Sequence, residues 1–401
     1  MTQPVAPAGA NSWLLGTRKG AWALRRTGAG PTDWTPSEPW FFGCQVHHLV
    51  QDPRGAGTIL ASVKTGHLGP TVFRSTDAGR TWTESVRPPK FKTPEQYAGS
   101  ALPEDDPRRK GRTIDHVFFL APGHASTPGR WYAGTSGIGL FRSDDDGVSW
   151  DAVDSFNDLP VLREWAYGFS EQTPDGAKCH SVQVHPADAN RLALGLSGGG
   201  VFVSKDAGAT WNPVNLGVAM DFAPPKTDGT EYETGHDPHD LVIHPAKPDR
   251  WYHQNHCGIY RLDWDESAPR QRWHRIGDHM PKDVGDIGFP MTCHPRNADV
   301  CWVVPMDGGT VWPRTSVGGK PAVYRTRDGG ASWQRLDAGL PAPAWYTILR
   351  QAMAHDGRDP LGLAFATTSG DVWFSAEEGD RWHCVARHLP KIWSVTAGRL
   401  A

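Results

Sequence analysis

Residues 75–82 read Ser-Thr-Asp-Ala-Gly-Arg-Thr-Trp, and their pattern Ser-x-Asp-x-Gly-x-x-Trp decides the fold. The pattern returns four more times, twice intact and twice altered, at residues 143–150, 204–211, 326–333 and 375–382. Trp34 and Trp273 mark two further places where little else of the pattern remains, so seven tryptophans recur at intervals of 48 to 68 residues. A repeat of this length, filled with short β-type runs, predicts a β-propeller whose blades are four-stranded sheets.

The repeated pattern is an Asp-box, which suits a tight hairpin turn. Its Ser and Asp side chains bond to the backbone of the turn, its glycine takes a dihedral that other residues avoid, and its tryptophan packs between blades. The chain resembles the sialidase-like BNR/Asp-box and YVTN/BNR-like repeat β-propeller family over nearly its whole length. That resemblance implies the fold but no particular reaction, because the same architecture serves hydrolases, lyases, receptors and assembly factors.

The two ends of the chain predict how the ring closes. Residues 12–16 and 21–25 are β-type runs that precede Trp34, which leaves this repeat without an inner strand. Residues 392–397 follow the last Asp-box and supply the missing strand. We therefore expect an all-β, seven-bladed β-propeller that forms a single domain over residues 1–401.

Composition and charge exclude several classes of function. The formal net charge of -3 gives no reason to expect a polyanionic partner, and the basic cluster at residues 108–112 is typical of a solvated loop. Residues 1–11, expected to be flexible, lack the features of a signal peptide, and no apolar run is long enough to cross a bilayer. We expect a cytoplasmic protein that binds neither nucleic acid nor membranes.

Four histidines occupy one register, six residues before a proline: His47, His116, His180 and His239. The strand that opens each repeat of a propeller is innermost, so these imidazoles are expected around one mouth of the central channel. Four nitrogen ligands suit iron, copper, zinc or manganese better than calcium or magnesium. We predict one bound transition-metal ion, with Fe(II) favoured over Zn, Cu or Mn. The alternative is that each histidine caps a loop through a backbone hydrogen bond.

The other histidines have different expected roles. Three of them directly precede a proline at the end of a strand, which predicts turn residues rather than metal ligands: His185, His244 and His294. His48 faces away from the axis if His47 faces it. His256, in a stretch next to glycine, is a weaker candidate that would support the metal ligands.

The remaining inner strands carry other residues in the same register. Counting six residues back from Pro295 gives Phe289, and an alignment through His355 gives Arg350. An aromatic wall and a guanidinium opposite the metal predict a small anionic or aromatic substrate. Phe289 and Arg350 are therefore expected to bind the substrate.

Long connections precede three of the histidine-bearing strands, at residues 83–115, 151–179 and 212–238. We expect them to cover the same mouth as a lid that excludes water. They carry polar residues suited to acid–base work or to orienting a ligand: Glu164, Tyr167, Glu171, His236 and Asp237. Among these, Glu164 and Glu171 are predicted to be catalytic together with Arg350.

The predicted centre favours oxidative chemistry. Iron-dependent carotenoid-cleaving oxygenases are similar in plan, with four histidines of a seven-bladed propeller around iron, although no sequence motif is shared. By this analogy we predict a non-haem iron oxygenase that activates O2 beside a small organic substrate. The same ligands around zinc would instead polarise water for hydrolysis.

Two further functions stay open. Sialidase-like glycoside hydrolysis, which the Asp-boxes imply, requires an arginine triad and an Arg-Ile-Pro stretch, and the chain offers only Arg18 and Arg350 toward the triad. Xyloglucan-cleaving Asp-box enzymes usually pair two propellers around a cleft, whereas this chain has the length of one. A non-catalytic scaffold for protein interaction is the other alternative, and it predicts an empty channel mouth.

Overall fold

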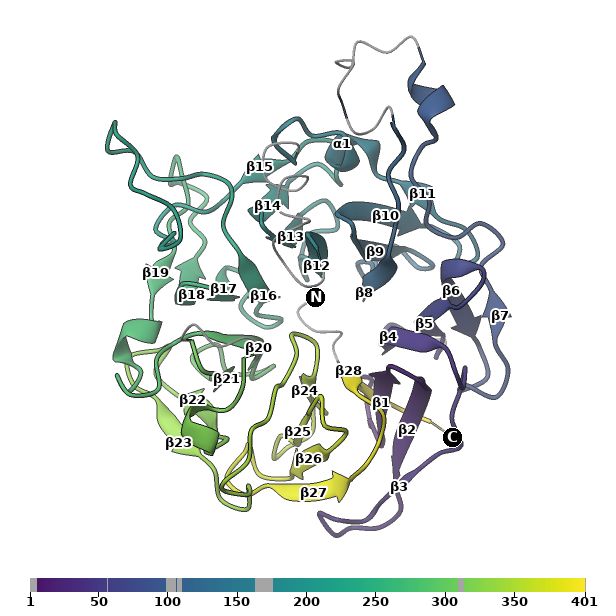
Figure 1. The fold of residues 1–401 in the computed structure, drawn as a ribbon, viewed down its shortest axis with the longest axis vertical. Coiled ribbons are helices and arrows are strands. Elements are labelled where there is room, and N and C mark those ends of the chain that lie inside the picture. The colour runs from purple at the N-terminus through teal and green to yellow at the C-terminus, as the bar shows by residue number, and fades with distance from the viewer. Residues whose placement is uncertain are drawn as a thin grey trace.

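The computed structural model describes residues 6–55, 57–98, 106, 110–162, 176–308 and 314–400. Its sheets stand around a common centre, each with one edge toward the centre and one toward the rim, which is the arrangement of a β-propeller (Figure 1). Helix is almost absent from this part of the chain, which contains α1 (Asp154–Asn157) and the short 3₁₀ turns η1 (Pro94–Tyr97), η3 (Gly277–His279) and η4 (Val317–Gly319). None of these helices has the length and apolarity that crossing a bilayer requires.

Five of the sheets have four antiparallel strands each. The sheet that joins both chain ends contains β28 (Ile392–Gly398), β1 (Ser12–Thr17), β2 (Gly20–Arg26) and β3 (Trp34–Pro36). The next sheet contains β4 (Gln45–Gln51), β5 (Ile59–Thr65), β6 (Gly69–Ser75) and β7 (Thr83–Glu84). The other three contain β16 (Pro238–Ile243), β17 (Arg250–Asn255), β18 (Gly258–Asp263) and β19 (His274–Arg275); β20 (Gly288–Cys293), β21 (Cys301–Pro305), β22 (Val323–Thr326) and β23 (Gln334–Leu336); and β24 (Met353–His355), β25 (Leu363–Ala366), β26 (Val372–Ser375) and β27 (His383–Ala386).

The sixth sheet has eight strands, where separate four-stranded sheets were expected. It contains β8 (His116–Pro122), β9 (Trp131–Ser136), β10 (Gly139–Ser143), β11 (Asp151–Ala152), β12 (Lys178–Val184), β13 (Leu192–Ser197), β14 (Gly200–Ser204) and β15 (Asn212–Pro213). Strands β9 and β12 are joined through a single residue pair, Ser136 with Lys178. One backbone contact therefore merges two sets of four strands, and the sheet count differs from the seven that the repeat predicts.

The two ends of the chain meet in one sheet. β28 pairs antiparallel with β1, and Thr396 lies opposite Leu14. The Thr396 hydroxyl also donates to the carbonyl oxygen of Leu49 in the neighbouring sheet, at 2.6 Å. β28 is thus the edge strand of the sheet that also contains β1, β2 and β3.

The Asp-box residues form one repeated turn. In the first copy the Ser75 hydroxyl donates to Asp77 at 2.8 Å and accepts from the Gly79 amide at 2.9 Å, while Asp77 accepts from the Thr81 amide. Gly79 has a φ of +84°, a backbone conformation that side chains disfavour. The buried Trp150 of the next copy donates its indole N–H to Ser85, which follows β7. The motif therefore closes the outer hairpin of this copy, and the tryptophan of the next copy bonds to it.

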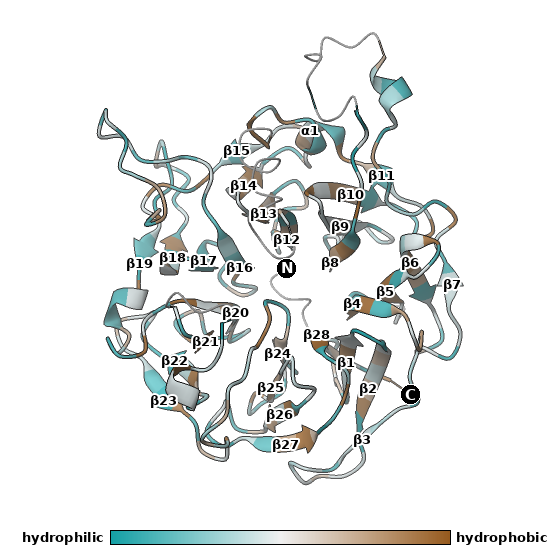
Figure 2. Cartoon of the chain, viewed as in Figure 1, coloured by the Kyte–Doolittle hydropathy of each residue, from teal (hydrophilic) through white to brown (hydrophobic). Residues whose placement is uncertain are grey.

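The hydrophobic core lies between adjacent sheets. Val242 and Tyr252 of one sheet belong to the same buried cluster as Met291 and Val303 of the next, and removal of such apolar area from water is the main force that holds the blades together. Hydrophilic residues concentrate in the outer connections and in outermost strands such as β7, β19 and β23 (Figure 2).

The three histidines that precede a proline are turn residues, as predicted. The Nδ1 atoms of His185, His244 and His294 each accept a backbone amide two residues further on. His244 also donates its Nε2 proton to the carbonyl oxygen of His294 in the next sheet, at 2.7 Å. These imidazoles therefore stabilise the turns that follow the inner strands, and His244 also links two neighbouring sheets.

Parts of the long connections extend outward. The segment around η1 and the segment between β15 and β16 both reach beyond the ring of sheets in Figure 1. The second of these connections then returns to the centre, where Asp237 immediately precedes β16. This return brings Asp237 to the inner strands.

Candidate functional site

Each histidine-bearing inner strand contains a β-bulge, which leaves one residue without a cross-strand partner. The bulged residues are His47 in β4, His180 in β12 and His239 in β16, and Phe289 lies in the corresponding irregularity of β20. A bulge turns a side chain out of the regular alternation of the strand, and bulges often occur beside functional sites. Three of the four predicted histidines therefore share a backbone setting.

His116 does not lie at a bulge. In β8 the bulged residue is Phe118, and His116 stands two residues earlier, opposite Ser136. The spacing to Pro122 misplaces this histidine because the equivalent turn comes two residues later, where His124 bonds to the carbonyl oxygen of Pro186 at 3.0 Å. The prediction that His116 lies in the common register is wrong.

The residue after the bulge contacts the neighbouring sheet. His48 accepts the Leu120 amide at 3.0 Å through Nδ1, and Asp240 accepts the Met291 amide at 3.1 Å. Burial lowers the pKa of His48 to about 3, so this imidazole is neutral at physiological pH. As expected, His48 points away from its neighbour His47 and serves the packing of blades.

His47 and His116 form a stacked pair. Their ring centroids lie 3.7 Å apart with the planes 12° from parallel, and His47 also stacks on Trp393. The Asp115 carboxylate lies 2.6 Å from His116 Nδ1 and forms an ion pair with Lys64. Burial, and then the proximity of His116, lower the pKa of His47 well below its usual value. His47 is therefore a neutral ring packed between two others.

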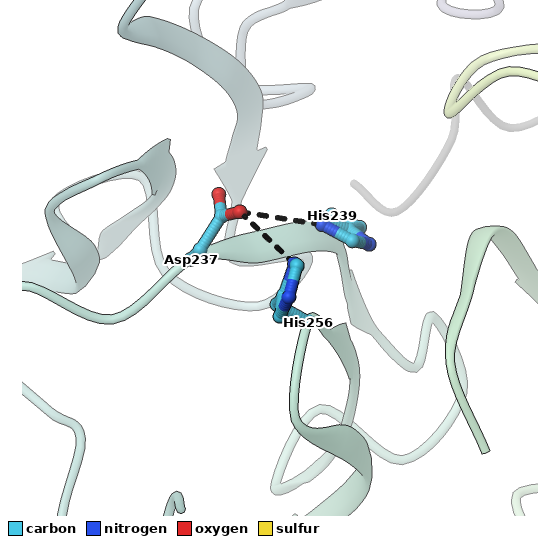
Figure 3. Close-up of side chains that lie close together, drawn as sticks. All are labelled: Asp237, His239 and His256. Atoms are coloured by element: carbon cyan, nitrogen blue, oxygen red, sulfur yellow. Dashed lines mark ion pairs between the residues drawn. The ribbon is translucent and has the colours of Figure 1, made fainter. Parts of the chain in front are cut away.

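A second group surrounds His239 (Figure 3). The Asp237 Oδ2 atom lies 3.4 Å from His239 Nε2 and 3.6 Å from His256 Nδ1. His256 belongs to the turn between β17 and β18, and its backbone amide donates to the Asp237 carbonyl oxygen at 2.9 Å. Among the described residues these three are the only group of three or more potential metal ligands, with all ligand atoms within 4.8 Å of one another. The four predicted histidines do not form such a group.

Arg350, Phe289 and His180 lie close to this second group. The Arg350 guanidinium stands over the Phe289 ring at 4.8 Å and its Nη2 lies 3.4 Å from the Ser197 hydroxyl, while Phe289 is 4.7 Å from the His239 ring. Burial, and then the charge of Arg350, lower the pKa of His180 well below its usual value. The structure thus brings Arg350 and Phe289 together with His239, as the spacing predicts.

The electrostatics of the group centre on Asp237. Burial acts to raise the pKa of Asp237, but the contact with His239 and the nearby charge of Arg350 outweigh it and hold this pKa well below its usual value. Burial lowers the pKa of His239 to about 4. The group therefore contains an ionised carboxylate beside neutral imidazoles.

Several expected residues lie elsewhere. Glu164, Tyr167 and Glu171 lie outside the described residues. His236 bonds to the Tyr232 carbonyl oxygen at 3.0 Å and serves the loop that precedes β16. Arg314, which sequence reasoning missed, places its Nη2 atom 3.5 Å from His256 Nε2. No repeat spacing marks Arg314, because it lies in a connection between strands β21 and β22.

Comparison with known proteins supports the fold and redirects the function. No family model matches the chain. A xyloglucanase of Acetivibrio thermocellus is 24% identical over 318 residues, which cover 73% of this chain and 32% of that protein. The chain thus spans about a third of the length of the curated relative that it matches.

The solved structures show the same fold. A GH74 xyloglucanase from Xanthomonas campestris aligns with a TM-score of 0.63 and 20% identity, over 96% of this chain and 55% of that chain. A protein described as a putative 6-phosphogluconolactonase from Bacteroides fragilis aligns with a TM-score of 0.55 and 11% identity, over 97% of this chain and 98% of that chain. The chain is an all-β, propeller-like protein.

These comparisons correct the predicted reaction. The expectation of a non-haem iron oxygenase is wrong, because the matched relatives are xyloglucanases, which are glycoside hydrolases. The analogy failed because it depended on four equivalent histidines around one ion, and His116 is out of register while His47 stacks on it. The glycoside hydrolase alternative agrees better with the relatives.

Proposed function

We propose that the chain is a hydrolase of glycosidic substrates whose centre is the group Asp237, His239 and His256. The observation that carries this proposal is a carboxylate held ionised at the inner strands, between two imidazoles. The xyloglucanase relatives support the choice of carbohydrate as the substrate class.

The proposed chemistry assigns Asp237 the role of base. Glycosidases use two carboxyl groups, one ionised to activate water or attack the sugar and one protonated to assist the leaving group. Asp237 is ionised, which this role requires, and its position beside His239 and His256 rather than its low pKa is the argument for the assignment. Glu164 and Glu171 remain the predicted sources of the acid.

Arg350 and Phe289 are proposed to orient the substrate. A guanidinium presents several donors in a plane, which suits a carboxylate or a pair of hydroxyl groups. Phe222, 44% exposed, stands edge-on to His256 at 5.8 Å and offers an aromatic surface for the apolar face of a sugar ring. Acidic polysaccharides therefore belong beside xyloglucan among the test substrates.

We also propose a blade number, a mode of ring closure and a family relationship for this fold. The eight-stranded sheet is interpreted as two blades joined by one residue pair, which gives seven blades in all. Pairing of β28 with β1 supports closure of the ring by the C-terminal strand. The hydrogen-bonded Asp-box turns support a relationship to Asp-box propellers.

The test is release of reducing ends from xyloglucan, polygalacturonate and neutral β-glucans by the full chain. We expect at least one polysaccharide to be cleaved by the wild type but not by Asp237→Asn. The matched control is Asp283→Asn, which changes an exposed aspartate. A folded wild type that cleaves none of them, or an Asp237→Asn variant that remains fully active, would contradict the proposal.

A further inference from the structure

We infer that Asp237, His239 and His256 bind one divalent transition-metal ion of the zinc type. This inference does not depend on hydrolysis, because metal affinity is measured without a substrate. In the metal-bound state Asp237 is a ligand, so its proposed role as a free base applies to the metal-free chain. It replaces the ring of four histidines with a mixed site of one carboxylate and two imidazoles.

Two of the three distances between ligand atoms match a metal site, and all three are within 4.8 Å. Asp237 Oδ2 lies 3.4 Å from His239 Nε2 and 3.6 Å from His256 Nδ1. Donor atoms about 2.1 Å from a tetrahedral zinc ion lie about 3.4 Å from one another. The side chains therefore need little movement to hold an ion between them.

The tautomer of His239 favours a cation between the three side chains. Its Nδ1 atom lies 2.6 Å from the Gly288 carbonyl oxygen. A carbonyl oxygen can accept a hydrogen bond but cannot donate one, so Nδ1 carries the proton of the neutral ring. In this neutral tautomer the lone pair of Nε2 faces Asp237 Oδ2 at 3.4 Å, and the two atoms require a proton or a metal ion between them. A carbonyl that fixes the far nitrogen of a ligand histidine is typical of metal sites.

A second observation comes from Asp237 itself. Its Oδ1 atom is buried and has no hydrogen-bond partner in the described part of the chain. A buried carboxylate oxygen without a partner is costly unless a cation or an ordered water satisfies it. A metal ion shared with the two imidazoles would remove this cost.

The backbone holds the three ligands in place before an ion arrives. Pro238 pairs with Asn255 across β16 and β17, and the His256 amide bonds to the Asp237 carbonyl oxygen. All three ligands therefore lie at one end of one strand pair. Three protein ligands leave a fourth position for water, whose pKa a zinc ion lowers toward neutrality.

Arg314 is expected to weaken binding of the ion, so its removal provides a second test of the metal site. Its guanidinium lies 3.5 Å from His256 Nε2 and can only donate, so it favours the neutral His256 tautomer with the proton on Nδ1, the atom that a metal ion needs, and its positive charge repels a cation. Arg314→Leu is expected to bind Zn²⁺ more tightly than the wild type. A role of these residues in packing alone predicts no such gain.

The experiment is calorimetric titration of the metal-free full chain with ZnCl₂, beside elemental analysis of the dialysed complex. We expect one ion per chain and at least a tenfold loss of affinity in His256→Gln, whose partly exposed side chain is replaced without disturbing the core. His239→Asn is the second variant if the first fails to fold. His116→Gln is the control and should bind Zn²⁺ as the wild type does.

Two results would overturn the inference: a folded wild type that binds no Zn²⁺, or loss of binding in His116→Gln but not in His256→Gln. The outcome is distinct from that of the proposed function. Zinc binding without cleavage of any polysaccharide leaves the metal site standing and removes the hydrolase. Cleavage by a chain that binds no metal does the reverse.

Discussion

The two histidine groups at the inner strands differ in what surrounds their imidazoles. His47 stacks on both His116 and Trp393, and the exposed Asp115 pairs with His116 from outside. His239 instead faces the partly buried carboxylate of Asp237, with its other nitrogen fixed by a backbone carbonyl. Equal spacing in the sequence therefore does not produce equal chemistry. The neighbours of each ring decide whether it packs or binds.

Of the four variants, Asp237→Asn should have the largest effect, because it removes the carboxylate that distinguishes the His239 group from the His47 group. The amide cannot accept a proton from water, so turnover on the cleaved polysaccharide should fall by about 10² to 10⁴, the usual contribution of a positioned base. Initial rates with the wild type, Asp237→Asn and Asp283→Asn measure it. Equal rates for all three would move the chemistry away from this group.

Arg350→Met should weaken binding of the substrate. The variant keeps an unbranched side chain over Phe289 but loses the charged donors, and a hydrogen bond to a charged group contributes about 1.5 to 3 kcal/mol. KM for an acidic polysaccharide should therefore rise roughly 10- to 100-fold with a smaller change in kcat. A fall confined to kcat would instead place Arg350 in the chemical step.

His48→Gln tests whether a histidine used for packing makes the stability of the chain depend on pH. The folded-state pKa of His48, about 3, lies below its unfolded value, so the folded chain binds fewer protons between these limits. The stability that this group contributes is complete above the unfolded pKa and is lost as pH falls from about 6.5 toward 3. The glutamine side chain of the variant retains an acceptor for the Leu120 amide but does not titrate, so the urea midpoint should decline less steeply over this range. An unchanged slope would exclude His48 as its source.

Asp115→Asn should have the smallest effect. The Asp115 side chain is 59% exposed, and exposed ion pairs contribute about 1 kcal/mol or less. We expect thermal unfolding to shift by no more than a few degrees and polysaccharide cleavage to stay within about twofold of the wild type. A loss of cleavage as large as that in Asp237→Asn would make the stacked pair part of the centre.

Much of the fold follows from the sequence because its signals are local and repeated. The Asp-box turn depends on residues within one octapeptide, and the same hydroxyl-to-carboxylate bond forms in four of its copies. The pairing of β28 with β1 follows from a missing strand at one chain end and an extra strand at the other. The joining of β9 to β12 escaped prediction, because a single backbone pair has no sequence signature.

The site was only partly predictable. Spacing brought His239, Phe289 and Arg350 together correctly, because each lies at the start of an inner strand or just before it. It misplaced His116, since the bulge of β8 lies at Phe118 and the following turn is shifted. The closeness of His256 to Asp237 depends on how a turn after β17 meets the start of β16, which spacing does not encode.

Anomalous diffraction from crystals grown with Zn²⁺ tests most directly whether the chemistry belongs to the Asp237 group. The account predicts one strong peak above the zinc edge, about 2.1 Å from ligand atoms of Asp237, His239 and His256. A peak coordinated by His47, His116 and His180 instead would contradict it and restore the ring of histidines.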